Sequence, residues 1–151
     1  MIVYRLSKRM YANDLSGKGA EIVGGRWNSK GVAMLYTAQS IALCVAEIAV
    51  HVPLGILPID YCLVHIDIPD DSMAEVKKLP VAWNIFPHPD DTQKLGDTFI
   101  FDAKKLVLKV SSAAVQGEFN YLLNPRHPDF NKVKVHIIEK FSFDERLFIR
   151  T

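Results

Sequence analysis

The 151-residue chain has almost no excess of charge of either sign and no long uninterrupted apolar run. Its 18 Lys and Arg against 17 Asp and Glu leave a formal net charge of +1, which indicates no bulk attraction to nucleic acid or an anionic membrane. No apolar stretch reaches the roughly 20 residues that span a bilayer, because Glu47 and Pro53 interrupt the longest one. The first residues, MIVYRLSKRM, also lack the apolar segment of a signal peptide. We therefore expect a cytoplasmic protein, and any anion site must be local.

Cysteine is also scarce. Cys44 and Cys62 both fall inside apolar segments, without the spacing of a metal site, so we expect buried free thiols. The content of 49% hydrophobic and 23% charged residues is typical of a globular chain rather than a disordered one. The length favours a single domain over residues 1–151.

Strand patterns outnumber helix patterns along the chain. Apolar alternation predicts strands over 2–6, 34–38, 61–68, 106–110 and 133–143, with a last short one at 146–148. Helices are predicted over 41–51 and 90–105, a short helical turn near 127–133, and loops over 7–25 and the proline-rich 79–89. Because helices do not alternate regularly with strands, the pattern favours an α+β fold over a doubly wound parallel sheet.

The segment that follows Ser40 contains the most informative residue. Ser40 is a candidate N-cap, and the next eleven residues are apolar on almost every side, which is typical of a core helix. Glu47 is the one carboxylate within it, and burial of an unpaired charge costs several kcal/mol. Glu47 therefore has a partner, such as a core-facing arginine or His51 at i+4, or it faces a cavity. A Glu-x-x-x-His metal pair lacks a third ligand of matching spacing, so no metal is expected.

The segment Gly24-Gly25-Arg26-Trp27-Asn28 also suggests a site. Paired glycines allow positive φ and a close approach by a ligand, and an arginine beside an aromatic plane suits a phosphate or carboxylate. The residues alone leave two alternatives open, namely an anion site and a tight turn with a surface arginine.

Two further polar residues have an ordinary and a functional interpretation. Tyr36, on the short strand before the helix, fits a core aromatic whose hydroxyl reaches solvent. Ser112, among small residues after a strand, fits either a solvated strand end or a residue that faces a cleft. The chain has no G-x-S-x-G elbow, P-loop, G-x-G-x-x-G or zinc signature.

Three separated segments, taken in order, resemble the RES domain, whose members are the toxins of RES–Xre toxin–antitoxin pairs. They are GGRWNSKG, MLYTAQSIALCVAEIAVHV, and VSSAAV with EFNYLLNPRHPDF. The likeness extends from YRLSKRMYANDLSGKGA near the start to FDERLF near the end. The arginine, glutamate and serine that name the family match Arg26, Glu47 and Ser112, and its tyrosine matches Tyr36. Proline is common in the family where Ser111 stands, and the register with Ala-Ala-Val selects Ser112.

The resemblance implies an ADP-ribosyltransferase-like fold, a compact α+β arrangement around a split sheet. It implies consumption of NAD+ by cleavage of the nicotinamide–ribose bond, as a glycohydrolase or phosphorylase. NAD+ is then a substrate, with no permanently bound cofactor and no metal. The implied catalytic residues are Arg26, Tyr36, Glu47 and Ser112, and the implied NAD+-binding residues are Arg5, Gly25, Trp27, Asn28 and Asn120.

The residue types fit that chemistry. Nicotinamide leaves as a cationic group and generates an oxocarbenium-like ribosyl centre, which the carboxylate of Glu47 would stabilise best in a water-poor setting. Arg5 and Arg26 would hold the pyrophosphate by guanidinium forks. Tyr36 would stack on or wall the nicotinamide, and Ser112 would bond its amide or the ribose.

The resemblance also implies a partner, an Xre-family antitoxin with a helix-turn-helix that carries the DNA contact. The sequence does not show how inhibition works, and our hypothesis is that the partner occludes the cleft near GGRWN. A homodimer within that complex is expected. Two alternatives stay open. In the first, ADP-ribose passes to phosphate or to a protein instead of water. In the second, the chain is a non-catalytic interaction module or an RNA-cleaving toxin.

Overall fold

One mixed sheet contains every strand of the described residues, in the order β4-β5-β6-β2-β1-β3-β7. The computed structural model describes residues 1–150. The strands are β1 (Ile2–Lys8), β2 (Leu35–Ala38), β3 (Tyr61–Asp67), β4 (Met73–Glu75), β5 (Val107–Ser111), β6 (Phe119–Leu123) and β7 (Lys134–Phe141). Neighbouring strands are antiparallel except β4 and β5, which are parallel. The predicted α+β class is confirmed.

The helices of the described residues are few and short. They are α1 (Lys18–Val23), α2 (Ile41–His51) and α3 (Asp90–Asp102), with 3-10 turns η1 (Arg9–Tyr11), η2 (Phe130–Lys132) and η3 (Glu145–Leu147). The predicted N-cap of α2 is confirmed, because the Ser40 hydroxyl accepts a hydrogen bond from the Leu43 amide at 3.0 Å. Residues 79–89 form no helix or strand, also as predicted.

Some local predictions were wrong. The expected loop over 7–25 contains η1 and α1, which are too short to show apolar periodicity. The strand expected at 146–148 falls largely in η3, where the side chain of Asp144 caps the turn by accepting from the Arg146 amide. The sequence pattern also missed β6, because its residues 121–123 are buried on both faces and do not alternate.

The prediction that α2 is buried on every side was also wrong. Only Leu43 and Cys44 of this helix are buried, whereas Ile41 is 37% exposed and Val50 is 63% exposed. Glu47 is half-buried. The helix therefore packs on the sheet by one face, and its carboxylate lies near a boundary with solvent rather than in the middle of a core.

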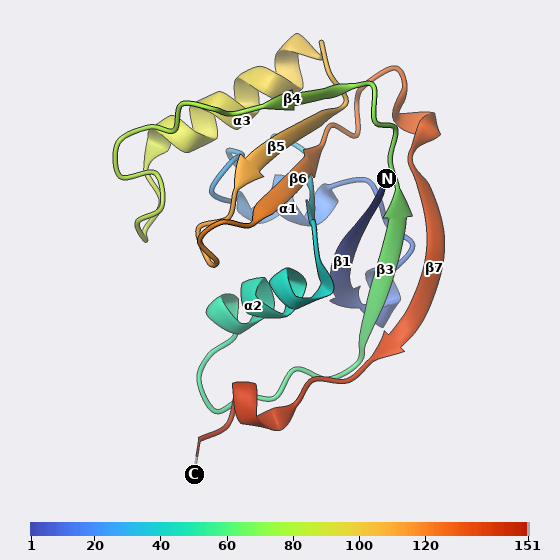
Figure 1. Cartoon of the computed structure of the whole chain (residues 1–151), viewed down its shortest axis with the longest axis vertical. Helices are drawn as coiled ribbons and strands as arrows, with labels where there is room; N and C mark the ends of the chain where they lie inside the picture. Colours follow the sequence, from blue (N-terminus) through green and yellow to red (C-terminus); the bar gives the residue numbers. More distant parts are fainter. Residues whose placement is uncertain (151) are drawn as a thin grey trace.

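The sheet is split between β1 and β2. These strands pair at the single position Tyr4–Ala38, while β1 pairs with β3 over its whole length from Ile2 to Lys8. Figure 1 shows β1, β3 and β7 as one curved half, β4, β5 and β6 as the other, and α2 beside the place where the halves meet. A buried cluster that includes Leu6, Ala38 and Leu43 packs α2 there. The split leaves space between elements that an unbroken ladder would close.

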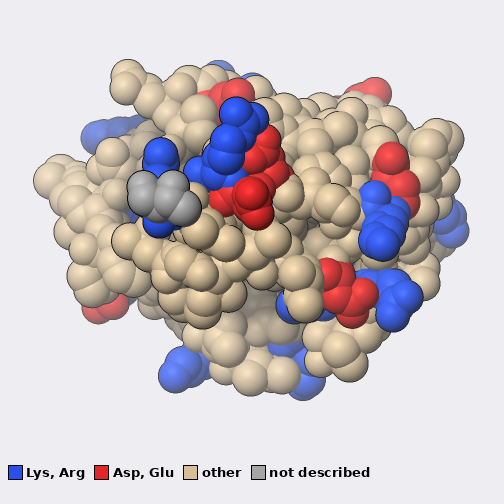
Figure 2. Space-filling view, turned by 90° about the horizontal axis from the view of Figure 1, so that it is seen from below, with Lys and Arg blue, Asp and Glu red and all other residues tan. Residues whose placement is uncertain are grey.

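Charged side chains form small mixed groups over the surface seen in Figure 2, with wide uncharged areas between them. Ion pairs of exposed residues close in sequence or space also occur, such as Arg146 with Asp144 and Arg9 with Asp60. The pattern agrees with the net charge of +1. Within residues 1–150 no helix is long and apolar enough to cross a membrane.

Gly96 fixes how closely α3 approaches the segment that contains Arg26. It is buried, and a Cβ built on it would fall inside van der Waals contact of the Trp27 carbonyl oxygen and 2.7 Å from the carbonyl carbon. Both atoms belong to the backbone and cannot rotate away. Packing therefore requires glycine at position 96, although glycine is unfavourable inside a helix such as α3.

We predict that Gly96→Ala lowers the free energy of unfolding by about 1–3 kcal/mol, as overpacking of a buried site does. Urea denaturation followed by fluorescence measures the change. The matched control is Gly19→Ala in α1, where a Cβ would meet nothing within 4 Å. Equal denaturation midpoints for the two variants would contradict the packing role of Gly96.

Candidate active site

The two glycines before Arg26 have different roles. Gly24 ends α1 with φ +73°, the positive φ that the sequence predicts. Gly25 is needed for space, since a Cβ there would lie 2.7 Å from the Tyr36 hydroxyl oxygen and 2.9 Å from Asn28 Oδ1. The predicted positive φ is confirmed at Gly24, whereas the groups that approach Gly25 closely are the protein's own side chains and the approach of a ligand stays a prediction.

Tyr36 and Asn28 fix the loop that follows. The Tyr36 hydroxyl donates to Asn28 Oδ1 at 2.6 Å and accepts from the Trp27 amide at 3.1 Å. Asn28 is fully buried, and its Nδ2 donates to the Ala20 carbonyl at 2.8 Å and the Val32 carbonyl at 2.9 Å. Burial raises the pKa of Tyr36 well above its ordinary value, so the phenol stays protonated and acts as a donor.

One face of α3 holds the same loop from outside. Gln93 Nε2 donates to the carbonyls of Gly25 and Asn28, both at 3.0 Å. Asp97 accepts from the Ser29 amide at 2.9 Å and from its hydroxyl at 2.6 Å. With Gly96 between them, these two side chains make α3 a rigid support for the backbone on either side of Arg26.

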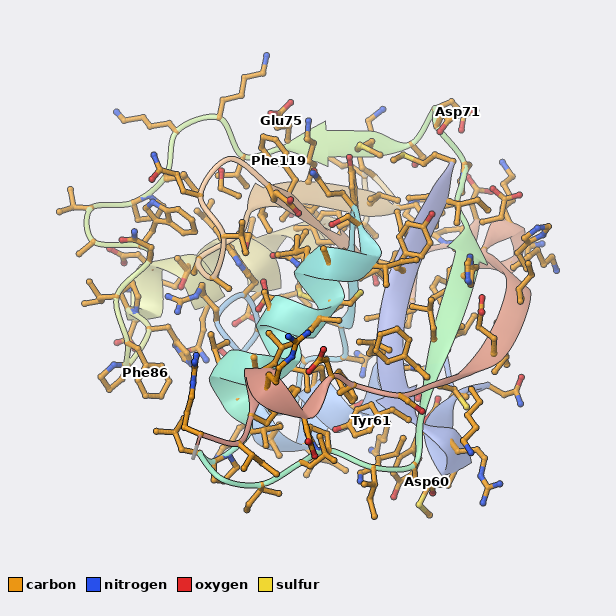
Figure 3. All side chains as sticks on the ribbon, turned by 60° about the horizontal axis from the view of Figure 1, so that its bottom comes forward. Asp60, Tyr61, Asp71, Glu75, Phe86 and Phe119 are labelled. Carbon is orange, nitrogen blue, oxygen red and sulfur yellow. The ribbon has the colours of Figure 1, made fainter. Side chains whose placement is uncertain are left out.

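Arg26 links this loop to the proline-rich loop 79–89. Its Nη1 donates to the Trp83 carbonyl at 2.6 Å and to the Ile85 carbonyl at 2.8 Å. The next residue, Phe86, is 84% exposed and lies at the outer edge of the molecule (Figure 3). Burial lowers the pKa of the Arg26 guanidinium, and the nearby negative charge of Glu47 opposes that shift. Arg26 therefore stays charged and lies within electrostatic range of Glu47.

Glu47 has a hydroxyl partner. The Ser112 hydroxyl donates to Glu47 Oε1 at 3.0 Å and accepts from the amides of Ala114 and Val115, both at 3.1 Å. Ser112 is buried, so these bonds fix its hydroxyl toward the carboxylate. No described residue forms an ion pair with Glu47 within 4.0 Å, and His51, the alternative partner, is exposed.

Two cavities lie near this arrangement; Ser112 lines one and Tyr36 lines the other, and Glu47 and Arg26 line neither. The β1–β2 cavity has a volume of about 210 Å³ and lies at the split of the sheet; its lining includes Arg5, Asp14, Lys18 and Tyr36. The Ser112 cavity has a volume of about 200 Å³ and is lined by Trp83, Asn84, Ser111, Ser112, Ala113, Gln116 and Gly117. One cavity contains basic side chains and the other contains only uncharged ones.

Arg5 enters the β1–β2 cavity from β1. Its Nη1 donates to the Asp14 carbonyl at 2.9 Å, and burial lowers the pKa of its guanidinium while the charge of Asp14 opposes the shift. Cys44, one turn before Glu47, is buried and free, and burial raises the pKa of its thiol to about 12. Cys62 is also buried and free, so the prediction for both cysteines is confirmed.

The structure gathers the predicted catalytic residues. Ser112 contacts Glu47, and the charges of Arg26 and Glu47 both act on Tyr36. The NAD+-binding predictions for Gly25, Trp27, Asn28 and Asn120 stay predictions. Trp27 and Asn28 are buried supports of the loop, and Asn120 on β6, whose Nδ2 donates to the Thr37 carbonyl at 3.4 Å, lines neither cavity.

The sequence did not indicate the residues that complete the site. Trp83 and Asn84 lie in a loop predicted only to be ordered, and Gln93 and Asp97 lie in a helix with no predicted role. A tryptophan within a proline-rich stretch is the one signal that could have identified the loop, since a large aromatic on an ordered loop commonly packs over a site.

We predict two effects of Tyr36→Phe on stability. At neutral pH the free energy of unfolding falls by about 1–3 kcal/mol, because the buried Asn28 oxygen and Trp27 amide lose their partner. The folded-state pKa of Tyr36 is raised, so wild-type stability is complete below the ordinary tyrosine pKa of about 10 and falls as pH rises above it. Tyr36→Phe has no hydroxyl to ionise, so its free energy of unfolding lacks this part of the decrease at high pH. Urea unfolding at several pH values measures both effects, with the exposed Tyr11→Phe as control; identical profiles for the two variants would contradict the role of the hydroxyl.

Comparisons with known proteins agree with one another. The family model of the RES domain matches residues 2–145. The chain is 39% identical over 141 residues to the Prs ADP-ribosylating toxin of a Sphingobium species, a match that covers 90% of this chain and 88% of the relative. It is 38% identical over 151 residues to Toxin Res of Pseudomonas putida, which covers 98% of this chain and 100% of the relative.

A solved structure shares the fold. The crystal structure of the MbcT–MbcA toxin–antitoxin complex of M. tuberculosis contains a chain that matches with a TM-score of 0.68 and 20% identity, over 93% of this chain and 84% of that one. At this identity the likeness shows the fold alone. The family match and the two relatives cover the segments that contain Arg26, Glu47 and Ser112. The chain belongs to the RES domain family.

Proposed function

We propose that this chain is the toxin of a toxin–antitoxin pair and that it consumes NAD+ by cleaving the bond between nicotinamide and ribose. The observation that carries the proposal is the carboxylate of Glu47, half-buried at the split of the sheet, held by the Ser112 hydroxyl and within electrostatic range of Arg26. The names of the relatives, Toxin Res and Prs ADP-ribosylating toxin, support it.

The reaction breaks the bond between ribose C1′ and the pyridinium nitrogen. The bonding electron pair leaves with nicotinamide, which becomes neutral, and C1′ develops positive charge. The Glu47 carboxylate lies beside that centre and stabilises it electrostatically. Water then adds to C1′ and releases a proton, so that the products are nicotinamide, ADP-ribose and H⁺.

The pyrophosphate binds on the basic side of the site. Arg5 and Lys18 contribute positive charge to the β1–β2 cavity, and Arg26 keeps Nη2 and Nε for a substrate oxygen while Nη1 holds loop 79–89. In this proposal the positive charge comes from these side chains and not from a metal ion. The hydroxyl of Tyr36 is bonded to Asn28 and is therefore not free for the substrate. Tyr36 contributes only its ring, as a wall of the β1–β2 cavity.

A second candidate is transfer of ADP-ribose to a protein side chain or to phosphate instead of water. The name of the 39% identical relative, Prs ADP-ribosylating toxin, favours a protein acceptor. The two candidates share every step up to formation of the ribosyl cation. They differ only in which nucleophile reaches C1′.

An antitoxin is the proposed partner. The solved neighbour belongs to a toxin–antitoxin complex, which supports a partner of that kind for this chain. We propose an Xre-like helix-turn-helix protein that carries the DNA contact and covers the site near Arg26, with the toxin as a dimer in the complex. Undiminished NAD+ consumption by the complex would contradict this mode of inhibition.

We predict that Glu47→Gln lowers kcat for NAD+ consumption by about 10²–10³-fold, the typical effect of losing one transition-state electrostatic contact. Glutamine keeps an oxygen that accepts from Ser112, so the fold is retained and only the charge is removed. Nicotinamide release measured by chromatography gives the rate.

The matched control is Glu145→Gln, an exposed glutamate in η3, which should leave the rate unchanged. Thermal unfolding of both variants verifies that the fold is intact. Wild-type rates in Glu47→Gln would refute the role of the carboxylate. RNA cleavage by a wild type that leaves NAD+ untouched would instead support an RNA-cleaving toxin.

The acceptor is identified by mass spectrometry of the ribose product. Incubation of the protein with NAD+ should yield ADP-ribose, and adding inorganic phosphate should leave the product unchanged. A product heavier by phosphate would identify a phosphorylase. ADP-ribose attached to an added cell protein would identify a transferase.

A further inference from the structure

The Ser112 cavity differs in chemistry from the β1–β2 cavity. The side chains that line it are one aromatic ring, two carboxamides and two hydroxyls, from Trp83, Asn84, Gln116, Ser111 and Ser112. None of its lining residues is charged, whereas Arg5, Asp14 and Lys18 line the other cavity. An anion such as phosphate finds no cation in the Ser112 cavity, so its lining favours a neutral, flat, hydrogen-bonding group.

Size limits the occupant further. The cavity volume of about 200 Å³ lies below the ~300–1,000 Å³ of pockets for drug-sized ligands. A single substituted aromatic ring fits within this volume. The ring of Trp83 offers a stacking surface, and the side-chain amides of Asn84 and Gln116 can pair with a carboxamide.

Position links the cavity to the bond that breaks. Ser112 lines it, and the hydroxyl of the same residue donates to Glu47 at 3.0 Å. A base seated against Trp83 and Asn84 would therefore be separated from the carboxylate by Ser112 alone. On the far side of that bond, the β1–β2 cavity would receive the charged remainder of the substrate.

Arg26 holds this wall in place. Its two hydrogen bonds to the Trp83 and Ile85 carbonyls fasten the turn that contains Asn84. The turn needs an anchor, because Ala82 adopts φ +55°, a left-handed conformation that is unfavourable for a non-glycine residue. Trp83 also packs against Trp27, with ring centroids 6.4 Å apart.

We infer that the Ser112 cavity is the receptor for the leaving base, in which Trp83, Asn84 and Gln116 bind the aromatic carboxamide and Arg26 positions the loop that contains Trp83 and Asn84. This inference rests on the proposed function, since it assigns one part of the same substrate. It makes loop 79–89 the element that selects the base and assigns nicotinamide, the first product, to a site separate from that of ADP-ribose.

Inhibition by each product tests the inference. With wild-type protein, nicotinamide and ADP-ribose should each inhibit NAD+ consumption. Asn84→Ala and Gln116→Ala should each raise the inhibition constant of nicotinamide roughly five- to tenfold, as loss of one hydrogen bond does, and leave that of ADP-ribose unchanged. Trp83→Phe should weaken nicotinamide less than Trp83→Ala, because phenylalanine keeps a stacking ring.

The control is Val81→Ala, a side chain that is 95% exposed in the same loop and should change neither constant. Ligand-detected NMR of nicotinamide with each variant gives the same comparison without turnover. If wild type consumes no NAD+, the proposed function fails. If wild type is active but Asn84→Ala and Gln116→Ala leave nicotinamide binding unchanged, or weaken ADP-ribose instead, this inference alone is overturned.

Discussion

The hydrogen bond from Ser112 to Glu47 is the interaction on which the site depends. Glu47 lies on α2, which follows β2 and packs against β1 and β2, whereas Ser112 follows β5, two strands from β2 in the sheet. The ladders between β2 and β6 and between β6 and β5 bring these two elements to the same half of the sheet, and within it the bond sets where the carboxylate lies. The bond ties the carboxylate to the end of β5 and to a residue that lines the Ser112 cavity.

A second set of bonds keeps the guanidinium opposite that carboxylate. Asn28 and Tyr36 fix the loop from within. Gln93 and Asp97 of α3 hold it from outside. Arg26 is thereby bonded to the backbone of loop 79–89 and lies within range of the charge of Glu47. Most residues near Arg26 thus serve to position it. If one of these side chains bound a ligand instead, the buried polar group to which it is now bonded would lose its partner.

Local signals in the sequence were sufficient for much of this arrangement. The Ser40 cap, the apolar segment after it and the alternation of 61–67 predicted α2 and β3 with nearly correct bounds, and the resemblance selected Arg26 and Ser112 before their surroundings were known. The exposure of α2 could not be predicted, because hydrophobicity does not show which face the sheet covers. The role of loop 79–89 also depends on the bonds from Arg26 to Trp83 and Ile85. These residues follow Arg26 by 57 and 59 positions, a separation at which no local sequence pattern indicates a contact.

The central claim is chemical: a fixed carboxylate stabilises a ribosyl centre that becomes cationic before any acceptor bonds to it. The secondary deuterium isotope effect at ribose C1′ of NAD+ tests this claim most directly, because it reports the bonding of that carbon in the transition state. A dissociative transition state predicts clearly slower consumption of the labelled substrate, whether water or a protein is the acceptor. Equal rates for labelled and unlabelled NAD+, measured under conditions where bond cleavage limits turnover, would contradict it.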